Sequence, residues 1–133
     1  MANPNPAPGF QRNPGHSVVL RTDGTAIVLR LGDDIVAETG NALTVTESGY
    51  PPRYYIPAGD VRMDLLEATD HRTYCPYKGD ARYWTVRTPG HVLENGAWAY
   101  DDPYDETAGL KGHISFYAEK MDVRINGEQA NGL

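Results

Sequence analysis

Cysteine, lysine and histidine side chains supply most of the reactive chemistry that this sequence offers. The only cysteine, Cys75, lies in the stretch CPYKG together with Lys78. A thiol becomes nucleophilic when a positive charge or a base lies close to it. His71 is four residues away, which is about 13 Å along an extended strand, so a pair with Cys75 requires a bend in the chain. His113, from a later segment, is the better partner, and we predict a catalytic set of Cys75, His113 and Lys78.

A free cysteine is also commonly an unreactive, buried hydrophobic residue. On that interpretation Cys75 only lines a pocket, and Lys78 fixes an acidic ligand without catalysis. The exposure of Cys75 and its distance from His113 separate the two interpretations. We also predict that Lys78 points into a cavity, because Gly79 allows a close turn beside it and aromatic neighbours can form walls.

Tyrosine is unusually abundant, with nine residues against two phenylalanines. The tyrosines cluster with proline and tryptophan in three separate blocks of the chain. Such a cluster is typical either of a small β core edged by aromatic side chains or of the walls of a ligand pocket. On the second interpretation, the predicted ligand-binding residues are Tyr54, Tyr55, Tyr77, Trp98, Tyr100 and Tyr117.

Metal-ligating residue types are present, but their spacing does not indicate a metal centre. His71, Cys75 and His113 are not at recognised ligand spacings. The acidic stretches GDD and DDPYDE are typical of solvated turns. We therefore predict neither a metal site nor a cofactor.

The overall composition is that of an ordinary globular protein. A length of 133 residues suits one domain, and 40% of the residues are hydrophobic. A formal net charge of −6 argues against nucleic acid and anionic lipid as partners. The sequence also lacks the apolar core of a signal peptide and a run of about 20 apolar residues. We expect a cytoplasmic monomer or homodimer that binds a small molecule, and neither nucleic acid nor a membrane.

The order of elements predicts an N-terminal arm followed by one β domain. Residues 1–16 are rich in Pro, Asn and Gly and predict an arm that is mobile or laid across the surface. From 17 to 126, short β-branched runs separated by turn residues predict one domain of antiparallel strands, and 127–133 form a C-terminal tail. The best helix candidate runs from Asp60, as its cap, to Glu67, packing Val61, Leu65 and Leu66 on the β core.

The strand that contains His113 has an informative alternation. In HISFY, Ile114 and Phe116 share one face, while His113 and Tyr117 share the other. The residues thus predict a mainly β, antiparallel fold with one short helix. They leave open whether it is a sandwich, a barrel or a pair of bent sheets.

Three blocks of the sequence resemble a known family: YPPRYYIPAGDVRMDLLEATDHRTYCPYKGDARYWTV, ENGAWAYDDP and GHISFYAEKMDV. Over roughly residues 17–126 they are similar to the bacterial domain-of-unknown-function family four-twenty-seven, sometimes labelled nucleotidyltransferase-like. The resemblance implies a small single domain of two bent sheets, tent- or sandwich-like, related to zinc-binding β folds without their cysteines. It also implies that CPYKG, the Trp98–Tyr100 segment and His113 converge on one cavity. The residues themselves carry neither the Gly-Ser turn with a paired-Asp strand of polymerase-β-like transferases nor a P-loop.

Three functional hypotheses remain open from the sequence. The first is an enzyme acting on a small polar or anionic molecule, with Cys75 as nucleophile or thiol donor, His113 as base or acid and Lys78 as anion clamp. The second is a non-catalytic module that binds such a molecule in the same pocket. The third is an interaction protein whose edge strands or proline-rich arm bind a partner.

Overall fold

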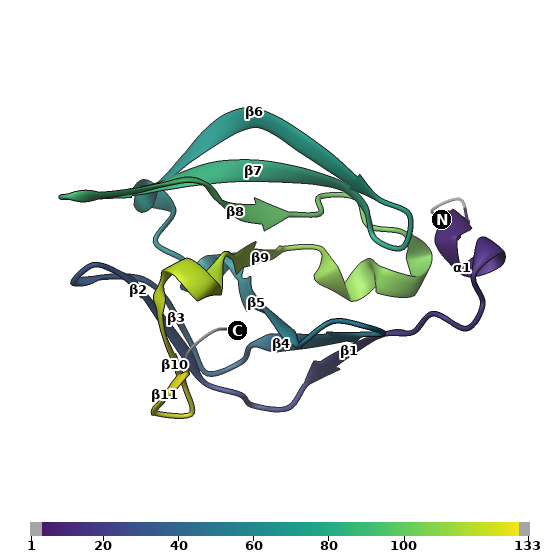
Figure 1. Cartoon of the computed structure of the whole chain (residues 1–133), viewed down its shortest axis with the longest axis horizontal. Helices are drawn as coiled ribbons and strands as arrows, with labels where there is room; N and C mark the ends of the chain where they lie inside the picture. Colours follow the sequence, from purple (N-terminus) through teal and green to yellow (C-terminus); the bar gives the residue numbers. More distant parts are fainter. Residues whose placement is uncertain (1–3, 131–133) are drawn as a thin grey trace.

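The computed structural model describes residues 4–130 and is built mainly from β-strands (Figure 1). They pair into two antiparallel sheets, as the sequence pattern predicts. The larger sheet has the order β1-β4-β5-β9-β8-β7-β6, and the smaller one β11-β10-β2-β3. The strands of the larger sheet are β1 (Val18–Thr22), β4 (Leu43–Glu47), β5 (Arg53–Pro57), β6 (Leu66–Cys75), β7 (Gly79–Thr88), β8 (His91–Ala99) and β9 (His113–Phe116). Those of the smaller sheet are β2 (Ile27–Leu31), β3 (Asp34–Thr39), β10 (Asp122–Ile125) and β11 (Glu128–Ala130).

The seven-stranded sheet is apolar on both faces, because alternate residues of a strand point to opposite sides. One face shares a core with the four-stranded sheet, and full burial of each large side chain in it stabilises the fold by about 1.5–3 kcal/mol. The centre of this core is formed by Ile27, Leu29, Val36, Ile56, Trp84, Val86, Ile114, Phe116 and Val123. The other face carries a second buried cluster that includes Val45, Tyr55, Tyr83, Trp98 and Tyr100.

The larger sheet curves as its strands succeed one another. In Figure 1, β6, β7 and β8 lie at the top of the view and β4 and β1 at the bottom, with β9 and β5 between them. The face with the second cluster therefore has strands on two sides of it, which is an arrangement that can enclose a ligand.

Helical structure is confined to short segments, and the predicted helix from Asp60 to Glu67 is wrong. That stretch contains two single 3-10 turns, after which β6 begins at Leu66. The Asp60 carboxylate caps no helix and accepts a hydrogen bond of 2.7 Å from the Thr39 hydroxyl. Pairing of the following residues with β7 satisfies backbone groups that a two-turn helix leaves unpaired. Helical segments are α1 (Pro8–Arg12) and the 3-10 helices Ala58–Asp60, Met63–Leu65, Asp105–Leu110 and Ala118–Lys120.

The packing expected of the misassigned stretch is nevertheless present. Val61 is buried in the core between the sheets, with Leu65 and Leu66 packed against it. The hydrophobic pattern thus predicted correctly which residues are buried, but not the backbone conformation, because a few apolar residues fit the period of a helix as well as that of a strand.

The two ends of the described chain lie against the sheets. α1 lies beside the turn between β6 and β7 (Figure 1), and β11 pairs with β10 at the edge of the smaller sheet. Among residues 4–130, none of the helices has the length and apolar character needed to cross a lipid bilayer.

Candidate functional site

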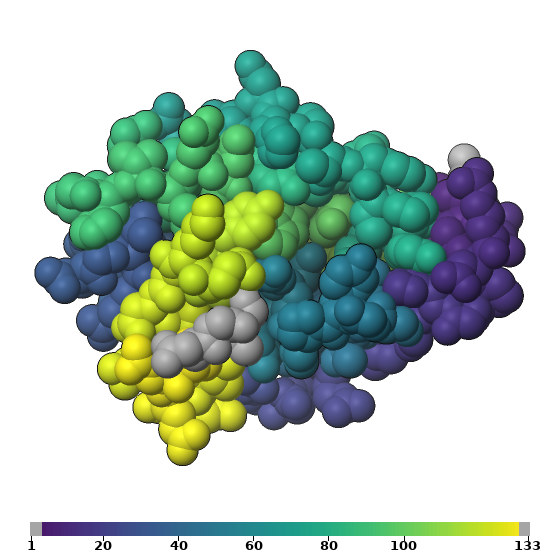
Figure 2. Space-filling view, in the orientation of Figure 1, coloured from purple at the N-terminus to yellow at the C-terminus, as the bar shows by residue number. Residues whose placement is uncertain are grey.

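A cavity of about 370 Å³ opens on the concave side of the larger sheet. In the space-filling view the surface is hollowed below β6 and β7 and above the segment that follows β4 (Figure 2). Its volume is at the lower end of the range found for ligand sites. The lining residues are Val45, Glu47, Tyr50, Pro51, Arg53, Tyr55, Cys75, Lys78, Tyr83, Trp98, Tyr100 and Tyr117.

Strand alternation on β5 decides which of its side chains reach the cavity. Arg53 and Tyr55 line the cavity, whereas Tyr54 and Ile56 pack on the core between the sheets. Tyr54, which the sequence predicts to bind ligand, therefore lies on the face of the sheet opposite the cavity. The same alternation on β4 brings Glu47 to the cavity at the end of an apolar face.

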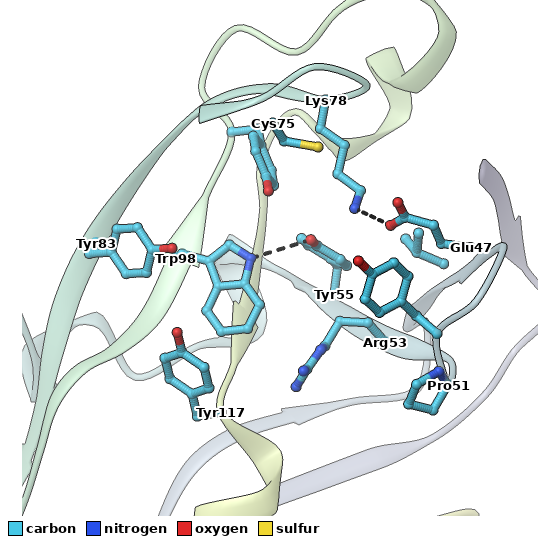
Figure 3. A pocket seen from close by; sticks show the side chains of 12 residues that line it. Glu47, Pro51, Arg53, Tyr55, Cys75, Lys78, Tyr83, Trp98 and Tyr117 are labelled. Carbon is cyan, nitrogen blue, oxygen red and sulfur yellow. Dashed lines mark hydrogen bonds and ion pairs between the residues drawn. The ribbon is translucent and has the colours of Figure 1, made fainter. Parts of the chain in front are cut away.

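The aromatic floor of the cavity comes from β5, β7, β8 and the residue directly after β8. Tyr55, Tyr83, Trp98 and Tyr100 are all buried, with at most 9% of each residue exposed. The Trp98 indole N–H donates a 3.3 Å hydrogen bond to the Tyr55 hydroxyl (Figure 3). Its ring centroid lies 4.9 Å from that of Tyr117 at the rim. The floor is thus buried and hydrogen-bonded, while Tyr117 at the rim is partly exposed.

The turn between β6 and β7 places Cys75 and Lys78 at the cavity. The Lys78 backbone N–H donates to the Cys75 carbonyl over 3.3 Å, which closes the turn. Gly79 follows with a φ of 113°, and a Cβ added there would lie 3.3 Å from the Asp102 carbonyl oxygen. Only glycine adopts this conformation without strain, so Gly79 fixes the direction of the turn.

Lys78 points into the cavity, as the sequence predicts, and forms an ion pair there. Its ammonium lies 2.6 Å from Oε1 of Glu47, and the lysine side chain is only 12% exposed (Figure 3). Burial has the largest single effect and alone would lower the pKa of Lys78, but the hydrogen bond to Glu47 and the charge interactions with Tyr55, Glu47 and Cys75 together raise the pKa. Burial alone would raise the pKa of Glu47, but hydrogen bonds from Lys78 and His16 lower it. Both groups are therefore charged near neutral pH, and Lys78 is a cation and not a base.

A second cation, Arg53, lies at the rim. Its guanidinium carbon lies 5.3 Å from the Trp98 ring centroid, within the range of a cation–π contact. Arg53 also donates to the Phe116 carbonyl over 3.2 Å and pairs with Glu119 over 3.3 Å. The pair with Glu119 is partly exposed, so solvent screens it.

The phenol groups of the floor are neutral hydroxyls at physiological pH. Burial raises the pKa of Tyr55 and of Tyr100, and also that of Tyr117 at the rim. Neutral phenols both donate and accept hydrogen bonds. The site thus combines aromatic faces, neutral hydroxyls, two cations and one carboxylate.

The structure assembles six of the nine predicted site residues and leaves three outside. His113 does not line the cavity, and its Nδ1 donates to the Lys111 carbonyl over 3.1 Å. The pairing of β9 with β5 explains this, because His113 is opposite Pro57, at the other end of the strand pair from Arg53. Tyr77 does not line the cavity and stacks on His16 of the N-terminal segment. The residues brought together are Cys75, Lys78, Tyr55, Trp98, Tyr100 and Tyr117.

Sequence reasoning identified Lys78 but missed the other two charged residues that line the cavity, Glu47 and Arg53, and also Tyr83. Strand alternation could have identified Glu47, Arg53 and Tyr83. Each lies two positions from a residue of the second buried cluster in the same strand, so its side chain is on the cavity side of the sheet. Tyr50 belongs to the first of the tyrosine blocks, but neither Tyr50 nor Pro51 was among the predicted ligand-binding residues, and both line the cavity.

Within the part of the chain that the structure describes, no three histidine, cysteine or acidic side chains gather where they could share a metal ion. Comparison with known proteins gives one family match. The family model described as Domain of unknown function (DUF427) matches residues 19–127. No curated protein matches the chain.

Proposed function

We propose that this protein, which belongs to the family described as Domain of unknown function (DUF427), binds a small organic anion in its aromatic cavity. The observation that carries the proposal is the presence of Lys78 and Arg53 in one cavity with aromatic walls. The chain has a formal net charge of −6, so two cations lining a single pocket are a local departure from its overall charge.

The polar groups of the cavity complement an anion attached to a planar group. The hydrogen bond to Glu47 uses one of the three N–H donors of the Lys78 ammonium. A ligand carboxylate or phosphate oxygen can accept another, and Arg53 can pair with the same ligand from the rim. The rings of Trp98 and Tyr117 both line the cavity and offer contact to a flat apolar body.

We expect the protein to prefer anions among ligands of the same shape. Benzoate, benzamide and benzylammonium share a ring and differ in charge, so their dissociation constants isolate the electrostatic contribution. Benzoate should bind about tenfold more tightly than benzamide, as expected for one partly screened, charge-assisted hydrogen bond. Benzylammonium should bind most weakly.

The two tryptophans provide an internal control for this titration by nuclear magnetic resonance. The indole N–H signal of Trp98 should shift on binding, because this ring lines the cavity. The signal of Trp84 should not, because this ring packs in the core on the opposite face of the sheet. Equal affinity for all three compounds, or equal shifts of both signals, would contradict the proposal.

The placement of Cys75 favours binding over nucleophilic catalysis. The predicted base, His113, lies outside the cavity, and Lys78 is held as a cation by Glu47. Cys75 is half-buried in the wall and packs against the second hydrophobic cluster. Its thiol is thus placed to contact a ligand, without either predicted group acting as a base.

Alkylation of Cys75 should therefore report occupancy of the cavity. We expect iodoacetamide to label the folded protein more slowly when benzoate fills the site, since the ligand covers the thiol. His113→Ala should leave the labelling rate unchanged, measured by mass spectrometry of the intact protein. A clear loss of labelling in His113→Ala would restore the catalytic pair and count against a purely binding role.

A further inference from the structure

The ion pair in the cavity extends to the N-terminal segment. Oε1 of Glu47 accepts from Lys78, while Oε2 of the same carboxylate lies 2.8 Å from Nε2 of His16. The three side chains are only 12–15% exposed. One carboxylate from β4 therefore links a residue of the N-terminal segment to a residue of the cavity.

The N-terminal segment also packs on the turn that carries Lys78. The ring of Tyr77 is stacked on His16 at a centroid distance of 4.1 Å and meets Phe10 edge-on at 4.9 Å. The Gly9 N–H donates to the Pro76 carbonyl over 3.0 Å. A Cβ on Gly9 would lie 2.6 Å from the Tyr77 ring, so the segment approaches the turn as closely as its backbone allows.

We propose that His16 is a positioning residue of the cavity, and that its protonation raises the affinity of Lys78 for an organic anion. The inference rests on the proposed function for its ligand, but its structural basis is the shared carboxylate of Glu47. Oε1 of Glu47 contacts Lys78 in the cavity, and Oε2 contacts His16, which lies in the N-terminal segment outside the larger sheet.

The direction of the effect follows from the charges around His16. The groups that face it are Glu47 from β4, the Tyr77 ring from the β6–β7 turn and, across the carboxylate, Lys78. When His16 is neutral, the negative charge of Glu47 offsets the positive charge of Lys78. Protonated His16 adds a positive charge to this cluster, so the field at the cavity becomes more favourable to an anion. Histidine is the side chain that commonly changes charge between pH 5 and 8.

The affinity for benzoate should therefore increase as the pH falls. We expect the dissociation constant to drop about three- to tenfold between pH 8 and pH 5.5, the size of one added charge at a partly screened distance. Benzoate itself stays ionised, since carboxylic acids titrate near pH 4. The measurement is the titration of the Trp98 indole signal at both pH values.

Two glutamine variants separate this effect from a structural role. His16→Gln keeps a hydrogen-bond donor for Glu47 but cannot be protonated, so its affinity should be independent of pH. His113→Gln removes a histidine outside the cavity and should behave as the natural sequence does. Equal pH profiles for the natural sequence and His16→Gln would overturn the proposal.

A ligand-free measurement distinguishes failure of this inference from failure of the proposed function. The side-chain ammonium signal of Lys78 should show one transition between pH 8 and 5.5, which His16→Gln abolishes. If benzoate fails to bind at either pH while this transition is present, the anion-binding function is wrong but the coupling of His16 to Lys78 stands. If the transition is absent from the natural sequence, the coupling itself is wrong.

Discussion

Lys78→Met should remove most of the preference of the protein for benzoate over benzamide. Methionine fills a volume similar to that of lysine but offers no charge or hydrogen-bond donor to the ligand. The two dissociation constants should then agree within about twofold, in place of the roughly tenfold difference expected for the natural sequence. Retention of the full preference in Lys78→Met would assign anion recognition to another group.

The same variant should also be less stable. It leaves the Glu47 carboxylate, whose side chain is only 15% exposed, with His16 as its remaining ion-pair partner. Loss of one partner from a largely buried charge typically costs about 1–3 kcal/mol, and urea unfolding at pH 7 measures it. Lys120→Met removes a lysine that is exposed to solvent and is the matched control, with little expected change in either stability or ligand preference.

Glu47→Gln should remove part of the acid sensitivity of the fold. The pKa of Glu47 is below its ordinary value of 4.5, so the ionised carboxylate stabilises the folded state above that pH. This contribution is lost as the pH falls through the lowered pKa. The natural sequence should therefore exceed Glu47→Gln by about 1–2 kcal/mol at pH 7, and the difference should shrink below pH 4.

The partner of Glu47 gives the opposite pH dependence. The pKa of Lys78 is above its ordinary value of 10.5, so its contribution is complete below that pH and is lost as the pH rises through the raised pKa. Urea unfolding from pH 3 to 11 measures the loss of the Glu47 contribution at low pH and of the Lys78 contribution at high pH. Glu119→Gln is the control, because its pair with Arg53 is exposed and screened by solvent. A constant difference between Glu47→Gln and the natural sequence from pH 3 to 7 would refute the ion-pair interpretation.

The amino-acid sequence by itself determined the fold class and the family. Short β-branched runs with turn residues between them specify antiparallel strands, because period-two burial and close turns are local properties of the chain. The same local information placed Lys78 and its turn at a cavity, since Gly79 and the adjacent aromatic residues are neighbours in sequence.

Only the tertiary structure decided which distant residues meet at the cavity. By strand alternation, His113 and Tyr117 belong to the same face. The register of β9 against β5 nevertheless puts His113 opposite Pro57, outside the cavity that Cys75 lines. Glu47, His16 and Lys78 belong to different segments, and the contacts of the Glu47 carboxylate with the other two depend on how the sheet curves and where the N-terminal segment docks. Alternation assigns a residue to a face, whereas register and curvature, which depend on long-range pairing, assign it to a partner.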